Sequence, residues 1–258
     1  MSLHAILAIS YRDLMKFVRD PARLISSFIF PLLFIGIFGE TMRANLGAGA
    51  GFDFLAFTFT GVFAQTLFMS TAQGVISLLE DRENDFSQEI FVSPISRYAI
   101  VFGKIAGESL VALPQGGAVL IFGLVFGIAI SVTQVLGLIM VGVVVCLFGG
   151  AFGVMLLSSF TSQRTANQIV PFIMIPQFFL AGVFAPIRVL PWYLEILSRL
   201  SPMRYAVDLA RGVFHIGEPE MAKIVLQTPI ANMAMIGLLF AVFLVVGTFL
   251  FVRGERNR

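Results

Sequence analysis

Long uncharged runs separated by short polar segments dominate the hydrophobic pattern of this chain. Residues 54–79 contain no Asp, Glu, Lys or Arg, and residues 109–163 form a second such run of 55 residues. A helix needs roughly 20 apolar residues to cross a bilayer core, so the first run predicts one membrane span and the second predicts two. With further apolar stretches nearer both ends, the pattern predicts a single domain, residues 1–258, that is an all-α integral membrane protein with six transmembrane helices. The expected spans are residues 22–39, 54–79, 105–130, 135–160, 165–184 and 231–252.

The segment before the first span is too polar to cross a membrane. Arg12, Lys16 and Arg19 recur on one helical face, and the apolar residues fall on another: Leu3, Ile6, Leu7, Leu14 and Val18. This spacing predicts an interfacial amphipathic helix over residues 1–20, with its basic stripe toward anionic lipid headgroups. The glycine-containing stretch 40–53 predicts a brief loop after the first span.

Residues 185–223 predict short helices on the other side of the membrane. Pro191 and Pro202 each stand where proline suits the start of a helix. In the second helix, spacings of four and three residues place Arg204, Asp208 and Arg211 on one face. The aromatic residues of the segment would anchor it at the membrane surface, so we expect half-immersed outer helices there.

Glycine pairs occur at four-residue spacing in two of the predicted spans. Gly123 with Gly127, and Gly149 with Gly153, each form a Gly-x-x-x-Gly pattern. Small residues at this spacing let helix backbones approach closely, so both pairs predict helix packing.

Five amide side chains within the predicted spans are candidates for a substrate path. They are Gln65, Gln73, Asn167, Gln168 and Gln177. The fifth span also contains Pro171 and Pro176, and irregular backbone at membrane depth is tolerated only inside protein or beside a watery cavity. We therefore place this span at the centre of the assembly. The alternatives are amides that only bond neighbouring helices, and a helix kinked merely for packing.

The charge-dense segment 80–104 is a loop held against the membrane by the spans on either side. Several acidic residues precede the apolar patch Ile90, Phe91 and Val92, and Ser93 with Pro94 then gives a helix-start signal. An apolar patch rimmed by charge usually marks a contact surface. A solvated linker is the alternative interpretation.

Composition narrows the possible functions. The chain is 58% hydrophobic and 12% charged, with a net charge of +2, so nothing suggests a nucleic-acid partner. One cysteine excludes an internal disulfide. We find no P-loop sequence, no His-Glu-x-x-His and no cysteine cluster, and no span has a charge near its centre. We therefore expect no cofactor or metal on this chain, no enzymatic activity of its own, and an energy source elsewhere.

Basic residues indicate the orientation. With six spans, the side that carries both termini and segment 80–104 holds 11 Lys and Arg residues, and the other side holds 6. Because basic residues concentrate in cytoplasmic segments, both termini and this segment are expected in the cytoplasm.

Segment 80–104 resembles the cytoplasmic loop of type-2 ABC exporter permeases. Glu83 and the run from Val92 to Arg97 fit that loop, which commonly reads Glu-Arg-Gly-Thr-Leu-Glu and, five residues on, Ser-Pro-x-Ser. Residues 85–88 depart from the usual pattern. Arg19-Asp20-Pro21 resembles the end of the family's flat N-terminal helix, and residues 182–211 resemble its outer re-entrant segment.

The resemblance implies a subunit without a motor of its own. Segment 80–104 would form the coupling helix that docks on a separate ATPase through these residues: Glu83, Glu89, Ile90, Phe91, Val92, Ser93, Pro94, Ile95, Ser96 and Arg97. The partners would be two ATPase copies, which hold ATP and Mg, and a second permease copy, either identical or a close paralogue. The complex would lie in the bacterial cytoplasmic (inner) membrane and export an amphipathic drug, lipid or lipid-linked glycan.

Two other functional classes remain open from the sequence. A self-contained secondary carrier or channel would need inverted repeats or buried ions, and we find no internal repeat. A lipid-modifying membrane enzyme would use Glu195, Arg204, Asp208 and Arg211 on the outer side, although their spacing matches no known catalytic set.

Overall fold

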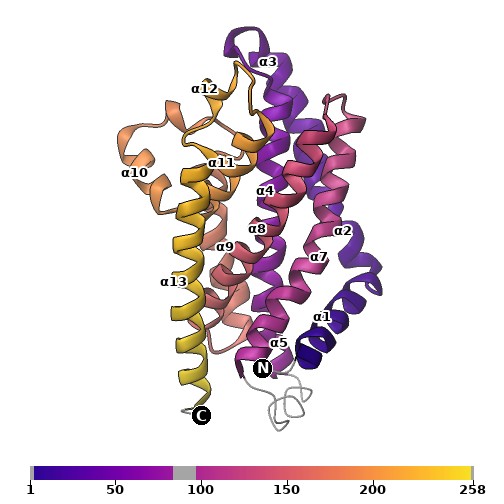
Figure 1. Ribbon diagram of the computed structural model, residues 1–258, viewed down its shortest axis with the longest axis vertical. Helices are drawn as coiled ribbons and strands as arrows, with labels where there is room; N and C mark the ends of the chain where they lie inside the picture. Colours follow the sequence, from indigo (N-terminus) through magenta and orange to yellow (C-terminus); the bar gives the residue numbers. More distant parts are fainter. Residues whose placement is uncertain (1–2, 84–96, 257–258) are drawn as a thin grey trace.

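The computed structural model describes residues 3–83 and 97–256, and every regular element in these ranges is helical (Figure 1). This confirms the predicted all-α fold. The elements are α1 (Leu3–Val18), α2 (Pro21–Leu33), the π-helix η1 (Phe34–Gly39), α3 (Glu40–Ala50), α4 (Phe54–Ile76), α5 (Leu78–Glu83), α7 (Arg97–Val125), α8 (Val132–Leu157), α9 (Gln163–Leu180), the 3-10 helix η2 (Ile187–Val189), α10 (Trp192–Leu200), α11 (Pro202–Phe214), α12 (Met221–Ile224) and α13 (Pro229–Arg256).

Five helical stretches in the described residues are long and apolar enough to cross a membrane. They are Pro21–Asn45, Phe54–Asp81, Tyr98–Val125, Val132–Leu157 and Met221–Arg253. They run along the long axis of the molecule, with both termini at the same end, which we call the terminal end (Figure 1). The predicted fifth span corresponds to α9, which is not among them because polar residues fill its first turns.

The first span is longer than predicted, and the prediction of a loop at residues 40–53 is wrong. The chain stays helical through η1 and α3 and stops only at Gly51, whose φ of 68° is a left-handed conformation that suits glycine. Most residues between Glu40 and Leu46 are good helix formers, so the helix continues until that glycine.

The most deeply buried of these helices is α4, which packs against α7, α8 and α11. In contrast, α9 lies at the edge of the chain, where Phe172 leaves 81% of its surface exposed. The chain thus places α4 at its own centre. The central position expected of α9 applied to an assembly of several subunits, which one chain does not test.

The contact between α4 and α8 depends on small residues, as predicted from the second glycine pair. A Cβ atom at Gly153 would lie 2.6 Å from the Ala72 carbonyl oxygen of α4, and one at Gly149 would lie 2.5 Å from the Phe68 oxygen. The other glycine pair, Gly123 with Gly127, does not lie along one continuous helix. Helix α7 ends at Val125, and Gly127 adopts a φ of 84° in the following turn.

Replacing Gly153 with alanine should therefore lower the free energy of unfolding by about 1–3 kcal/mol, since the added methyl group must push two backbones apart. Gly117→Ala in α7 is the matched control, because a Cβ there meets nothing within 4 Å. Unfolding in detergent, followed by circular dichroism, measures both variants. Equal stability of the two would contradict the close α4–α8 contact.

The amphipathic helix α1 exists as predicted, but it packs through a different face. Its buried residues against α7 include Ile9, Asp13 and Phe17, whereas Leu7 and Val18 of the predicted apolar face remain exposed. The Ser10 hydroxyl donates a 3.1 Å hydrogen bond to the Gly103 carbonyl oxygen. Polar contacts as well as hydrophobic burial therefore fix this helix.

Candidate functional site

A cavity of about 650 Å³ opens between α2, α4, α7 and α9. It brings together three of the five predicted path residues, Gln65 and Gln73 of α4 and Asn167 of α9. The complete lining is Phe17, Arg23, Ser26, Ser27, Phe30, Pro31, Gln65, Thr66, Met69, Ser70, Gln73, Gly74, Ile76, Ser77, Gln115, Gln163, Asn167, Val170, Pro171 and Phe178.

The other two predicted path residues do not line the cavity. Gln168 is exposed on α9, next to Asn167. Gln177 accepts long hydrogen bonds from the Ser201 hydroxyl (3.4 Å) and the Met203 amide (3.5 Å), so it ties α9 to α11. Of the two readings left open by the sequence, Gln177 fits the amide that bonds a neighbouring helix.

Two polar groups of the cavity wall have no hydrogen-bond partner among the described residues. The Gln65 carboxamide oxygen and the Thr66 hydroxyl are buried without a hydrogen-bond partner. Gln115 of α7 is only 5% exposed, and it was not predicted from the sequence. It carried the same signal as Gln65, an amide within an uncharged run, so the same rule would have identified it.

Phenylalanine rings cluster beside Phe30 and Phe178, two of the residues that line the cavity. The rings of Phe30 and Phe178 lie 6.3 Å apart. Phe34 stacks on Phe184 at 4.7 Å, and Phe38 meets Phe184 at 5.2 Å. The cavity therefore runs from a polar region toward an aromatic cluster formed by α2, η1 and the segment after α9.

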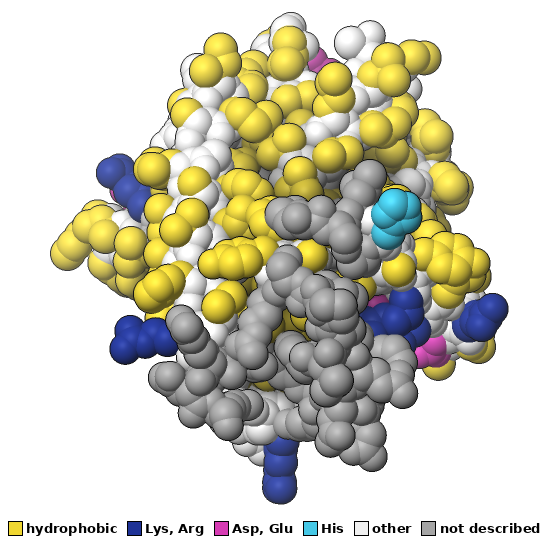
Figure 2. Space-filling model, turned by 60° about the horizontal axis from the view of Figure 1, so that its bottom comes forward, with side chains coloured by type: hydrophobic (Ala, Val, Ile, Leu, Met, Phe, Trp, Pro, Cys, Tyr) yellow, Lys and Arg dark blue, Asp and Glu magenta, His cyan; other side chains and the backbone are white. Residues whose placement is uncertain are grey.

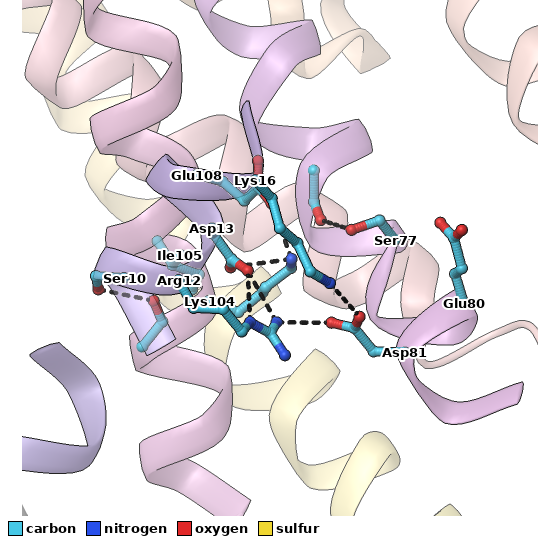
Figure 3. A network of polar contacts seen from close by, with 12 residues as sticks. Ser10, Arg12, Asp13, Lys16, Ser77, Glu80, Asp81, Lys104, Ile105 and Glu108 are labelled. Carbon is cyan, nitrogen blue, oxygen red and sulfur yellow. Dashed lines mark hydrogen bonds and ion pairs between the residues drawn. The ribbon is translucent and has the colours of Figure 1, made fainter. Parts of the chain in front are cut away.

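At the terminal end, a charge network joins α1, α5 and α7 (Figure 3). The Lys104 ammonium lies 3.0 Å from an Asp13 oxygen and 2.8 Å from a Glu108 oxygen. Arg12 bridges Asp13 at 2.8 Å and Asp81 at 2.7 Å. Burial alone would lower the pKa of Arg12, but the two carboxylates outweigh it and raise that pKa.

The network corrects the predicted role of the basic stripe on α1. Arg12 and Lys16 bind Asp81 rather than facing only lipid, with a Lys16–Asp81 distance of 2.9 Å. The side chains of Asp13, Lys104 and Glu108 are at most 3% exposed. Buried charges of this kind are tolerated only when they are paired, so the network holds these elements in one arrangement.

The network and the cavity meet at Arg23. This side chain lines the cavity, and its guanidinium lies 3.6 Å from a Glu108 oxygen. A second cavity of about 490 Å³ lies among the charged residues and also includes Arg23. The polar cavity and the charge network are therefore neighbours.

Most of the predicted ATPase-coupling residues lie outside the described residues. These are Glu89, Ile90, Phe91, Val92, Ser93, Pro94, Ile95 and Ser96. Glu83 ends α5 and Arg97 begins α7, and nothing is described of either side chain. The described helices on either side of this segment both belong to the charge network, through Asp81 and Lys104. Viewed from this end, Lys and Arg side chains are scattered around the margins of a face whose described surface is largely hydrophobic (Figure 2).

Residues 185–223 contain the short helices α10 and α11, and α11 is buried in the protein rather than exposed along one face. Arg204, Asp208 and Arg211 are each at most 5% exposed. Asp208 accepts hydrogen bonds from the Leu226 amide (2.8 Å) and the Gln227 amide (2.9 Å). In addition, it accepts one from the Asn232 side chain (2.8 Å). The charged face of α11 turns inward because it satisfies backbone groups of the segment before α13.

Arg211 and Arg204 also have structural partners. Arg211 donates to the Gly182 carbonyl at 3.0 Å and lies 3.6 Å over the Phe57 ring. Arg204 donates to the Ser198 hydroxyl at 2.9 Å. These contacts occupy three of the four residues that the lipid-enzyme alternative needed: Arg204, Asp208 and Arg211. By contrast, α10 is more exposed, and Trp192 leaves 76% of its surface accessible.

Known proteins similar to this chain are membrane permeases. A family model described as ABC-2 type transporter matches residues 4–215. The putative transport permease ycf38 of Cyanophora paradoxa is 24% identical over 204 residues, 76% of this chain and 69% of that protein. The inner membrane transport permease YadH of Escherichia coli is 25% identical over 210 residues, 79% of this chain and 80% of that protein. The probable multidrug ABC transporter permease YbhR of Escherichia coli is 27% identical over 142 residues, 54% of this chain and 38% of that protein.

Proposed function

This chain belongs to the ABC-2 type transporter family, and from that premise we propose that it is the membrane permease subunit of an ATP-driven exporter whose motor is a separate ATPase. One observation carries the proposal: the helices on either side of segment 84–96 are bound into the charge network, and that network adjoins the polar cavity. A push on this segment would therefore act on α1, α5 and α7 together and reach the wall of the cavity.

The direction of the helices supports six crossings with both termini in the cytoplasm. Helices α8 and α13 both run toward the terminal end (Figure 1). The chain must return between them, and α9 is the element that does so. The count of basic residues supports a cytoplasmic position for the terminal end. In a bacterial inner membrane, segment 84–96 would then face an ATPase.

A second permease copy would complete the cavity. Its edges are α2 and α9, and next to it both helices expose large apolar side chains, among them Ile25 at 60% and Phe172 at 81%. We propose that two permeases meet along these edges and that two ATPases bind ATP and Mg below them. Closure of the ATPases would push both loops and open the cavities outward.

The coupling role is tested by changing Ile90, Phe91 and Ile95 together to aspartate. The triple variant should lose at least 90% of the ATPase that copurifies with the wild-type permease, because an apolar docking patch does not tolerate three buried charges (on the order of several kcal/mol). Quantitative mass spectrometry of the purified complex measures the ratio of the two subunits.

The matched control changes two polar positions of the same segment, Asp85→Asn and Gln88→Glu. It should retain the ATPase, since neither position belongs to the apolar patch. Full retention of the ATPase by the triple variant would overturn the proposed docking site. Transport by this chain alone in liposomes would instead favour a self-contained carrier.

A further inference from the structure

The wall of the polar cavity combines neutral hydrogen-bonding groups with aromatic rings. Half of its lining residues are Ser, Thr, Asn or Gln. Arg23 is the single charged residue among the described lining residues, and the Glu108 oxygen 3.6 Å away, which belongs to a carboxylate shared with Lys104, offsets part of its charge. The cavity thus offers many hydrogen bonds and little net charge.

These groups favour an uncharged ligand over a cation. A buried cation needs a carboxylate or an aromatic cage, preferably with Trp or Tyr, whereas the described lining contains no carboxylate and only phenylalanine rings. An anion is usually held by several basic groups, whereas the described lining offers only Arg23, which also faces Glu108. A neutral ligand needs neither a carboxylate partner nor a cluster of basic groups, so it fits this lining best.

The unused groups of the wall indicate what the ligand must supply. The Gln65 carboxamide oxygen is buried in a residue that is 3% exposed, and it lacks a donor among the described residues. An unmet buried acceptor costs about 1–3 kcal/mol, so turning the Gln65 carboxamide toward a ligand hydroxyl that donates to it is favoured. Gln73, Gln115 and Asn167 add both donors and acceptors, which suits a group carrying several hydroxyls.

We propose that the cavity binds an amphiphile with an uncharged, hydroxyl-rich head group, such as a glycosyl or polyol lipid. The head group lies among Gln65, Gln73 and Gln115, and the alkyl chain extends toward Phe30 and Phe178. This inference rests on the proposed transport function and specifies its substrate class.

Three photoreactive probes with the same dodecyl chain test the inference on the permease–ATPase complex in nanodiscs without ATP. Their head groups are maltoside, trimethylammonium and phosphate, and labelled peptides are identified by mass spectrometry. At equal concentration, the maltoside probe should label the cavity segments of α4 and α9 at least about tenfold more than either charged probe, because a charge without a partner is costly to bury. Equal or stronger labelling by a charged probe would overturn the inference.

Substitutions test whether the amide side chains of the cavity wall bind the maltoside head group. Gln65→Leu with Gln115→Leu should reduce maltoside labelling by about tenfold, the effect of two hydrogen bonds of roughly 0.5–1.5 kcal/mol each. Gln73→Leu should reduce it by about threefold, and this exposed position lets the chain fold without repacking.

Gln168→Leu is the matched control, since this glutamine follows Asn167 on α9 but does not line the cavity. Unchanged labelling in the Gln73 and double variants, or an equal loss in Gln168→Leu, would overturn the inference. Copurification of the ATPase distinguishes the two failures. Lost selectivity in an intact complex refutes only the substrate class, whereas a permease that never binds an ATPase refutes the proposed function.

Discussion

Replacing Lys104 with methionine should lower the free energy of unfolding by about 3–5 kcal/mol, the usual cost of removing one partner from a buried ion pair. The Lys104 ammonium lies within 3.0 Å of both Asp13 and Glu108, and all three side chains are at most 3% exposed. Without the cation, two carboxylates stay buried with weaker compensation. Unfolding in detergent, followed by circular dichroism, measures the loss.

Lys16→Met is the matched control for this change. Lys16 also pairs with a carboxylate, Asp81, but its side chain is 53% exposed. Exposed pairs contribute about 0–1 kcal/mol, so this variant should be nearly as stable as the wild type. Adding Asp13→Asn and Glu108→Gln to Lys104→Met should restore part of the stability, because no uncompensated carboxylate remains there. Equal losses from Lys104→Met and Lys16→Met would show that burial does not govern the network.

Replacing Asp208 with alanine should cost about 3 kcal/mol, since the buried Asn232 side-chain N–H and two partly buried backbone amides lose their acceptor, and a buried donor without a partner costs about 1–3 kcal/mol. The Asp208 carboxylate accepts hydrogen bonds from the Leu226 and Gln227 amides and from the Asn232 side chain. These bonds fix the entry to α13 against α11. We expect a lower unfolding midpoint in detergent and faster proteolysis between α12 and α13.

Asp53→Ala provides the comparison for Asp208→Ala. Asp53 caps α4 by accepting a 2.8 Å hydrogen bond from the Leu55 amide, and it is exposed. Loss of such a cap costs typically about 1 kcal/mol. If Asp208→Ala were no more harmful than Asp53→Ala, the buried carboxylate would not be holding the start of α13.

Features set by neighbouring residues could be predicted from the sequence. Pro191 and Pro202 mark the start of α10 and α11, because proline fixes φ and lacks an amide hydrogen. Lys104 and Glu108 pair because four residues make about one helical turn. Gly149 and Gly153 predict close packing for the same reason. Each depends on spacing along a single element.

Which residues pack against each face of a helix could not be predicted from the sequence. The spacing of α1 gives two faces, but only the position of Asp81 determines that Arg12 and Lys16 form ion pairs. The charged face of α11 looks suited to the membrane surface, yet Asp208 faces the protein because unpaired amides of another segment lie there.

The candidate site shows the same division. Gln65, Gln73 and Asn167 were predicted separately, as amides in apolar runs, and the fold brings them to one cavity. Gln168 and Gln177 are also amides, but their positions around α9 direct them away from the cavity, and Gln177 bonds Ser201 instead.

The sequence by itself determined that this protein is a helical membrane protein, where most of its helices lie along the chain, and which loop fits the family's docking pattern. These follow from hydropathy and local spacing, which act over one or two helical turns. Only the tertiary structure decided which charges are buried together and which amides share a cavity, because burial and pairing depend on the neighbour that packing supplies.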